Sequence, residues 1–326
     1  MTFIYKRLWQ GLGVLVGTLT LVFTIFAWVP DPARELAGQN EREEVVQAFR
    51  VKHGLDKPVF LRYTTYMLNL VPFNSEGFRA PDLGKSFITD RPVLDAIKDA
   101  LPATLLLACV AMFFATIIGV SIGLVIAVNG PSKFGDLIIS ICALGMSAPS
   151  FVVAIIVAWL FGYVLHSYTG LPMTGGMVVV DPFEGPKLAL AHIILPAFTL
   201  GIRPLAVIVQ LTKNSALEVL DQPYVRTAKA KGLSKSRILF KHVLRNSLNP
   251  VITATSGWFA SMLAGAIFVE FVFGWKGMGL LMFKALESGD LPVVMGCTIV
   301  IATVFVLVNI VVDVLYGILD PRVRQS

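Results

Sequence analysis

The side chains that could do chemistry are few in this 326-residue sequence, and their spacing matches no familiar catalytic or metal site. The sequence has no Walker A motif, no His-Glu-x-x-His, no Cys-x-x-Cys pair and no serine nucleophile elbow. The histidines are dispersed, at His53, His166, His192 and His242. The cysteines lie inside apolar runs, as small buried hydrophobic residues do, at Cys109, Cys142 and Cys297. We therefore predict no catalytic residue, no metal site and no enzyme.

Ionisable side chains are rare inside the apolar runs. Arg203 lies within one run, and Glu270 and Asp313 lie near the ends of others. A transporter driven by protons or sodium ions usually has ionisable groups or broken helices at mid-membrane. Arg203 could fill such a role, but its long side chain can also reach the interface from where it lies. An ion-coupled secondary transporter is therefore an alternative, although the sparse charges favour a pathway powered by another protein.

The longest basic segment runs from Asp221 to Pro250. Asp221 is predicted to cap a short helix that tolerates Pro223 in its first turn and continues through Tyr224–Lys231. Gly232 is predicted to end this helix, because glycine readily takes the left-handed conformation that a C-terminal stop needs.

A second short helix is expected directly after this glycine. Ser234 is predicted to cap it, and Asn249-Pro250 is predicted to end it. Each helix of the pair is too short and too charged to cross a bilayer. The pair is thus expected to lie at a membrane surface or against another protein. A solvated cytoplasmic loop that only fixes the topology is the alternative.

The composition is that of a membrane protein. Hydrophobic residues make up 56% of the chain and charged residues only 15%, while the net charge is +6. The basic residues lie where the positive-inside rule places them, and they do not interleave with aromatic residues as on a nucleic-acid-binding surface. The sequence therefore predicts contact with membrane lipid and no binding of nucleic acid.

Six apolar runs are long enough to span a bilayer, and the fold class predicted is an all-α polytopic membrane protein. The predicted spans are Leu8–Val29, Leu101–Val128, Leu137–Leu165, Leu188–Leu211, Val251–Phe273 and Val293–Leu315. With Lys6 and Arg7 before the first span, the charge rule places both termini and the basic loops in the cytoplasm. The predicted parts are a first transmembrane helix at 1–29, an extracytoplasmic segment at 30–100, a five-helix core at 101–316 containing a cytoplasmic loop at 214–250, and a cytoplasmic tail at 317–326.

Two spans carry features that bear on packing. Pro149 lies inside the third span, where a proline removes a backbone hydrogen bond and is expected to kink the helix. In the fifth span, Gly257, Ser261 and Gly265 recur every four residues. Such a face is smooth enough for close contact between helices, so these three residues are predicted to pack against a neighbouring helix.

Several motifs together resemble one family. The segment Tyr224-Val-Arg-Thr-Ala-Lys-Ala-Lys-Gly-Leu233 resembles the cytoplasmic coupling loop of ABC importer permeases, in the form found in dipeptide and oligopeptide permeases of the B type. Similar matches lie along nearly the whole chain, at Asp31–Arg34, Gly54–Pro58, Asp82–Phe87, Leu101–Thr104, Val308–Tyr316 and Leu319–Arg324.

This resemblance implies a type I ABC importer permease with six transmembrane helices in a bacterial inner membrane. It implies pairing with a second homologous permease subunit, two cytoplasmic ABC ATPase subunits and an extracytoplasmic substrate-binding protein. No cofactor would be bound directly, because ATP and Mg would be used by the partner ATPases. The residues that would couple to an ATPase are Tyr224, Val225, Arg226, Thr227, Ala228, Lys229, Ala230, Lys231, Gly232 and Leu233. The solute implied is a di- or oligopeptide, while related systems also carry metal chelates or sugars.

The chain departs from the family pattern in two places. The general motif begins Glu-Ala-Ala, whereas Arg226-Thr227-Ala228 stands here, so a glutamate-based salt bridge is not expected. The outside loop of the family usually reads Pro-Gly-x-Gly, whereas Lys276 precedes Gly277 here and a rigid turn is lost. The segment 72–81 also looks longer than usual and is a candidate docking feature of this particular system.

Overall fold

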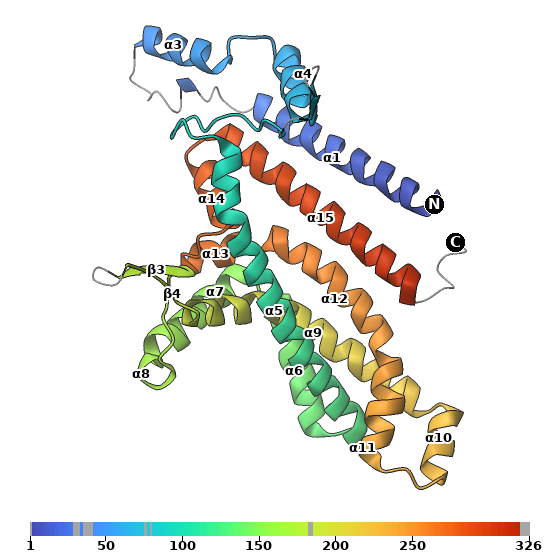
Figure 1. Ribbon diagram of the computed structural model, residues 1–326. Helices are drawn as coiled ribbons and strands as arrows, with labels where there is room; N and C mark the ends of the chain where they lie inside the picture. The colour runs from blue at the N-terminus through green and yellow to red at the C-terminus, as the bar shows by residue number, and fades with distance from the viewer. Residues whose placement is uncertain are drawn as a thin grey trace. The chain divides into compact units, whose positions relative to one another are not determined.

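The computed structural model of the protein describes residues 2–28, 33–34, 42–74, 77–78, 80–181 and 185–319. Most of the described chain is helical, as the sequence predicts (Figure 1). By its internal contacts the chain forms two compact units, Met1–Ala103 with Lys276–Ser326 and Thr104–Trp275. The terminal motif Leu319–Arg324 lies almost wholly outside the described residues, as do parts of the motif Asp31–Arg34 and of the segment 72–81.

The first unit contains two membrane-length helices that lie side by side. They are α1 (Thr2–Trp28) and α15 (Leu291–Leu319) (Figure 1). The unit also holds α3 (Glu43–His53), α4 (Val59–Leu70), the start of α5 (Val93–Asn129), α14 (Met278–Glu287) and a hairpin of β1 (Phe73–Asn74) with β2 (Gly77–Phe78). Its core includes Val93, Ile97, Met278, Val294 and Cys297.

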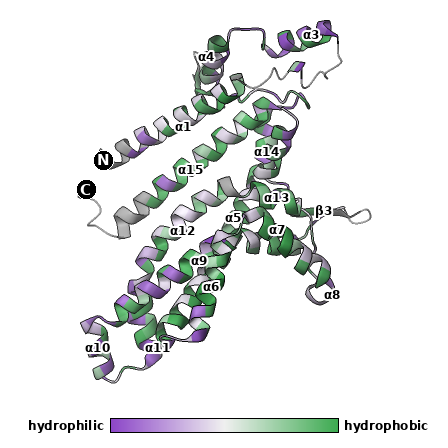
Figure 2. Cartoon of the chain, turned by 180° about the vertical axis from the view of Figure 1, so that it is seen from behind, coloured by the Kyte–Doolittle hydropathy of each residue, from purple (hydrophilic) through white to green (hydrophobic). Residues whose placement is uncertain are grey.

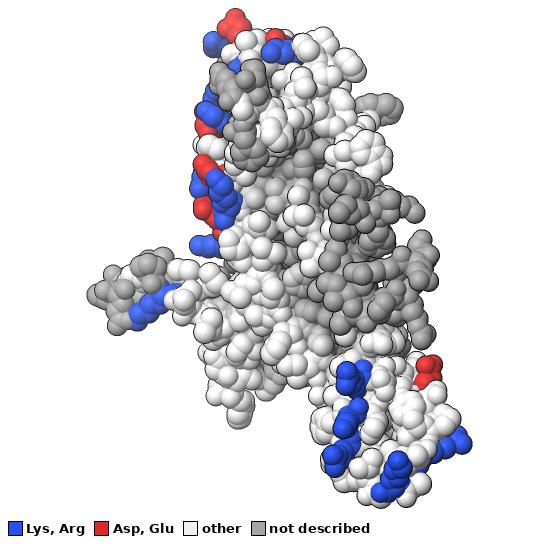
Figure 3. All heavy atoms as spheres, turned by 45° about the vertical axis from the view of Figure 1, so that its right-hand side comes forward, with Lys and Arg blue, Asp and Glu red and all other residues white. Residues whose placement is uncertain are grey.

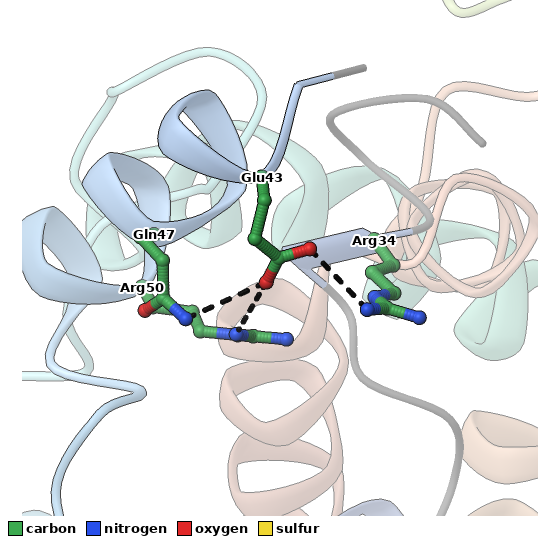
Figure 4. Close-up of polar contacts among 4 residues, drawn as sticks. All are labelled: Arg34, Glu43, Gln47 and Arg50. Atoms are coloured by element: carbon green, nitrogen blue, oxygen red, sulfur yellow. Dashed lines mark hydrogen bonds and ion pairs between the residues drawn. The ribbon is translucent and has the colours of Figure 1, made fainter. Parts of the chain in front are cut away.

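Two polar contacts fix segments of this unit. Glu43, in the first turn of α3, receives hydrogen bonds from Arg34 at 3.3 Å and Arg50 at 3.4 Å (Figure 4). These pairs are at least partly exposed, so each stabilises the fold by less than about 1 kcal/mol. The buried carboxylate of Asp290, just before α15, accepts hydrogen bonds from the Ser86 hydroxyl and from the Phe87 backbone N–H at 3.0 Å. This second contact holds the segment before α5 against the start of α15.

The second unit is built on α9 (Ala191–Leu220), against which α6 (Lys133–Ser147), α7 (Ser150–Trp159) and α12 (Arg245–Gly265) pack. Its other elements are the rest of α5, η1 (Leu160–Val164), α8 (His166–Thr169), β3 (Val178–Asp181), β4 (Gly185–Leu188), α10 (Pro223–Ala230), α11 (Lys235–Ile238), η2 (Leu239–Leu244) and α13 (Ile267–Phe273). The approach of α5 to α9 is close: a Cβ added to Gly123 would lie 2.7 Å from the Val209 carbonyl oxygen.

Among the residues that the structure describes, four helices are long and apolar enough to cross a membrane, or up to six if each of two bent pairs is one span. The four coincide with the first, second, fourth and sixth predicted spans. Hydrophobic residues dominate α5, α13 and α15, whereas hydrophilic residues gather on α3 and α10 (Figure 2). The all-α polytopic fold is therefore confirmed, and the cytoplasmic placement of the termini stays a prediction.

The third predicted span is not one kinked helix, and that part of the prediction is wrong. The chain turns by 113° between α6 and α7. Ala148, which precedes Pro149, has φ −71° and ψ 137°, an extended conformation that the ring of a following proline favours. Pro149 then precedes the first turn of α7, where its missing N–H is harmless.

The fifth predicted span is also bent, by 60° between α12 and α13. Beyond the bend, Glu270 is fully buried and accepts a hydrogen bond from the Thr104 hydroxyl at 2.6 Å, which satisfies one oxygen of a costly buried carboxylate. Between the predicted spans the structure contains further ordered elements. The region 166–187 contains α8 and the strand pair β3–β4, and the segment after Phe273 leads into α14, a helix that was not predicted.

Candidate functional site

The basic segment after α9 begins with the short helix α10, at nearly the predicted position. Its first residue is Pro223 and its last is Ala230, so it ends one residue before the predicted end. The residue before the helix is Gln222, whose side chain makes no capping hydrogen bond, so the prediction that Asp221 caps the helix is wrong. Asp221 instead ends α9, where its backbone N–H bonds to the Leu217 carbonyl. A proline at the first helical position makes a side-chain cap less necessary, since one N–H is already missing.

The glycine elbow after α10 is confirmed. Gly232 has φ +74°, in the left-handed region that glycine adopts at little cost. Nothing lies within 4 Å of a Cβ added there, so the backbone conformation alone explains the glycine. Ser234 then caps α11 as predicted, its hydroxyl accepting a hydrogen bond from the Arg237 N–H at 3.4 Å.

The second helix of the pair does not end at Asn249-Pro250, and this prediction is wrong. The chain runs from α11 through the π-helical turn η2 directly into α12, and Pro250 lies inside α12. A proline in a helix interior costs about 3 kcal/mol and usually ends or kinks the helix. Here α12 packs along α9, and that packing holds the helix together. The basic segment therefore continues without a break into α12.

The helix α10 has two faces with different roles. Val225 is fully buried and Ala228 is nearly so, and both belong to an apolar cluster with Ile238 and Val243. The cluster also contains Leu124, Ala127, Ala216 and Val219, from the ends of α5 and α9. The other predicted coupling residues are exposed, except for the half-buried Leu233: they are Tyr224, Arg226, Thr227, Lys229, Ala230, Lys231 and Gly232. One face thus fixes α10 to the bundle, and the other is presented outward.

A polar contact adds to this attachment. The Asn246 side-chain amide at the start of α12 donates a hydrogen bond to the Tyr224 hydroxyl at 3.0 Å and another to the His242 carbonyl at 2.8 Å. The rings of Tyr224 and His242 lie 6.5 Å apart. The role of Asn246 was not predicted from the sequence, because no local pattern links residues 22 positions apart. The division of α10 into two faces was not predicted either, although the three-residue spacing of Val225 and Ala228 places them on one side of a helix.

The outward face of this region is strongly basic. Between 221 and 250 its exposed cations are Arg226, Lys229, Lys231, Lys235, Arg237, Lys241 and Arg245, whereas Asp221 is the only acid. Figure 3 shows these basic side chains gathered at the end of the second unit. Such a surface favours an acidic partner or an anionic membrane surface. Within the described chain no group of three His, Cys, Asp or Glu side chains could hold a metal ion. The region thus combines a helix anchored by its buried face with an outward basic surface.

The small-residue face of α12 has no partner inside the described part of the chain at Gly257, where a Cβ would meet nothing within 4 Å. Ser261 is exposed as well, and Gly265 is the last residue of the helix. Other residues of α12 are buried instead, among them Val251, Ala260 and Met262. The predicted helix contact at Gly257, Ser261 and Gly265 thus stays a prediction about a neighbour outside this chain.

Arg203, in α9, contacts the last turn of α6, just before the break at Pro149. Its guanidinium donates to the Met146 carbonyl from Nε at 3.4 Å and from NH2 at 3.3 Å. Met146 lies in the last turn of α6, where carbonyl groups lack helical partners. The arginine therefore supplies a donor to the broken helix.

Comparison with known proteins finds similarity along nearly the whole chain. Residues 119–325 match the family model described as the binding-protein-dependent transport system inner membrane component, and residues 1–108 match the N-terminal model of the same description. This chain belongs to that family. It is therefore a multi-pass membrane transport component, a permease subunit of the ABC type.

The relatives of this permease are similar along their full length. A dipeptide transport system permease protein of Escherichia coli (strain K12) is 36% identical over 348 residues, covering 100% of this chain and 99% of the relative. A di/tripeptide transport system permease of Pseudomonas aeruginosa is also 36% identical, with the same coverage. The dipeptide permease of Alkalihalophilus pseudofirmus is 34% identical, covering 99% of each chain.

A solved structure has a similar fold. It is an inward-facing conformation of the MetNI methionine ABC transporter, with a TM-score of 0.56 and 18% sequence identity. The match covers 70% of this chain and 97% of the other. At this identity the likeness concerns the fold alone, and it supports the type I importer architecture for the permease.

Proposed function

We propose that this permease forms half of the translocation pathway of an ATP-driven, binding-protein-dependent importer of di- or oligopeptides. Support for the solute class comes from the full-length relatives, which are named as dipeptide or di/tripeptide permeases. From the same relatives we infer that the chain lies in a bacterial inner membrane, together with a second homologous permease, two cytoplasmic ABC ATPase subunits and a substrate-binding protein. ATP and Mg would then be bound by the ATPase subunits.

The observation that carries the coupling role is the two-faced helix α10. Its buried face, Val225 and Ala228, packs with the ends of α5 and α9, which are helices long enough to span the membrane. Its exposed face presents Arg226, Lys229 and Lys231 to a partner. A push on that exposed face would pass through the buried contacts into the spans, because a packed apolar core transmits displacement instead of absorbing it. We propose that this face lies in a groove of an ATPase, with its cations near acidic side chains.

Gly232 offers a test of this coupling. A β-branched residue at φ +74° is strained, and the left-handed conformation costs an L-residue about 1–2 kcal/mol. Because a new Cβ would meet nothing within 4 Å, Gly232→Val changes only the backbone preference. Gly232→Asn is the matched control, since asparagine tolerates this conformation.

In the assembled importer, Gly232→Val is expected to lower the number of solute molecules carried per ATP hydrolysed, while Gly232→Asn stays close to the wild type. Membrane insertion, followed by the amount of protein in the membrane fraction, is expected to be normal for both. Wild-type transport per ATP in Gly232→Val would contradict the proposed role of α10.

The composition of the complex tests the wider proposal. The full chain carrying a C-terminal affinity tag would be extracted in mild detergent from its native host, and the stoichiometric partners identified by mass spectrometry. A second permease and ATPase subunits are expected. A homo-oligomer that transports after reconstitution alone would favour the ion-coupled secondary transporter instead, and Arg203 would then be the first residue to replace.

A further inference from the structure

The first unit contains a cavity of about 520 Å³ that the proposed transport function does not use. Its walls come from the last turns of α1, the end of α3, one side of α4, the segment 83–90 and the first turns of α15. Its size falls within the range of small-molecule sites. Because five separate segments of the same compact unit converge on it, the cavity is a built feature of that unit.

The cationic side chains of the cavity outnumber its acids. Four cations line it, from Lys52, Lys57, Arg62 and Lys85. The single carboxylate is that of Asp90, which accepts a hydrogen bond from Lys52 at 2.9 Å. The excess of positive charge selects an anionic ligand.

Two further titratable groups line the cavity. His53 packs against both Phe49 and Phe87, with ring centroids 4.3 and 4.7 Å away. Burial, followed by the charge of Lys52, lowers its pKa, so the imidazole is mostly neutral at pH 7 and adds no positive charge. The Tyr66 hydroxyl is buried and has no hydrogen-bond partner within the part of the chain that the structure describes. Burial, followed by the charge of Asp82, raises the pKa of this phenol, which therefore remains a donor.

The other wall of the cavity is apolar and belongs to the membrane-length helices. Phe23, Phe26 and Ala27 come from the end of the apolar stretch of α1, and Leu291 and Met295 from the start of α15. The cationic side chains and the apolar wall of the cavity therefore meet at the level where α1 ends and α15 begins. That level is where the hydrocarbon of a bilayer gives way to lipid phosphates. A ligand that matches both walls is amphiphilic, with an anionic head and an apolar tail.

We propose that this cavity binds one anionic phospholipid, with the phosphate between Lys57, Arg62 and Lys85 and the upper part of the acyl chains against Phe23 and Phe26. Basic pockets beside membrane-spanning helices are suited to anionic head groups. The Tyr66 hydroxyl donates to an ester or phosphate oxygen and so gains the partner that it lacks. Below the cavity the acyl chains follow the exposed apolar side of α1, which includes Leu21 and Ile25. This inference needs only the membrane location and is independent of the solute carried.

The test uses the full chain, together with the subunits that co-purify with it, in native mass spectrometry after delipidation. Phosphatidylglycerol, phosphatidylcholine with the same acyl chains, and glycerophosphoglycerol without chains are titrated separately. One phosphatidylglycerol is expected to bind at least tenfold more tightly than either of the others. Equal binding of phosphatidylcholine would remove the role of the cations, and equal binding of glycerophosphoglycerol would remove the role of the apolar wall and favour a soluble anion.

Variants separate this cavity from general attraction to basic surfaces. The double variant Lys57→Gln/Lys85→Gln is expected to weaken binding of the single phosphatidylglycerol at least tenfold. The matched control is Lys98→Gln/Lys284→Gln, two exposed lysines of the same unit that do not line the cavity, and it is expected to bind as the wild type does. Ala27→Trp fills the apolar wall without changing charge and is expected to weaken binding as well. Equal affinities in the wild type, the cavity variants and the control would overturn the proposal.

Discussion

The attachment of α10 to the bundle can be weakened without touching its exposed face. Val225 is fully buried, and Val225→Ala removes two methyl groups from the apolar cluster. Each lost methyl group costs about 0.8 kcal/mol of transfer free energy. The cavity left behind adds a smaller term, so the expected loss is about 2 kcal/mol. This energy opposes the local opening of α10, which need not involve unfolding of the membrane-length helices.

The measurement is amide hydrogen exchange followed by mass spectrometry on the full-length permease chain in detergent, without ATPase subunits. A loss of about 2 kcal/mol corresponds to roughly 30-fold faster exchange of the α10 amides, since 1.4 kcal/mol is a factor of ten. Peptides from α1 and α15, in the other unit, are expected to exchange as in the wild type. The matched control is Lys229→Ala, on the exposed face of the same helix, which is expected to leave exchange unchanged.

The two variants are also expected to differ in function under the proposed coupling role. Val225→Ala is expected to lower transport per ATP hydrolysed while ATPase subunits still bind, because the docking face is intact but its anchor is loosened. Lys229→Ala is expected to weaken ATPase binding instead. Unchanged α10 exchange in Val225→Ala would refute the claim that this side chain anchors the helix. Equal acceleration in both variants would refute the division of α10 into two faces.

Three further outcomes are expected. Gly123→Ala brings a Cβ to 2.7 Å from a carbonyl oxygen of α9, so this substitution is expected to lower the melting temperature of the isolated chain in detergent. Gly257→Ala, whose Cβ would meet nothing within 4 Å, is expected to leave the melting temperature unchanged. Asp290→Ala removes the acceptor of the Ser86 hydroxyl and is expected to destabilise the packing of the segment before α5 by about 1–3 kcal/mol, seen as faster exchange of amides 84–92. Unchanged exchange of these amides would contradict the role given to the Asp290 contacts. Burial and a neighbouring lysine lower the pKa of His53 below 6.5, so the packing of α3 is expected to be fully stable above pH 6.5 and to weaken as pH falls below it. Exchange of the α3 amides at pH 7.5 and 5.5 measures this change, and His53→Asn is expected to abolish it.

Much of this permease follows from local properties of the sequence. The four continuous spans were predictable because an uninterrupted apolar run of that length has no other stable environment. The elbow at Gly232 and the cap at Ser234 were predictable because each depends on one residue and its immediate backbone. The family resemblance at 224–233 located the candidate site for the same reason, since its motif is contiguous.

The structural effect of the prolines could not be predicted from the sequence alone. Pro149 separates two helices that meet at 113°, whereas Pro196, Pro204 and Pro250 lie inside helices. In a helix interior each of these prolines would cost about 3 kcal/mol, and packing against neighbouring helices decides whether the helix continues through it or breaks. Sequence alone therefore placed the helix end at Pro250 wrongly and reduced the break at Pro149 to a kink.

Contacts between distant residues were decided by the tertiary structure alone. The Tyr224–Asn246 hydrogen bond, the burial of Val225 and the cavity beside Tyr66 each join segments that no sequence period connects. Hydrophobicity and backbone preference act residue by residue, so the sequence determined which segments are helical and which lie in the membrane. Side-chain packing acts between elements, so only the folded chain determined which face of α10 is an anchor and which is free to meet a partner.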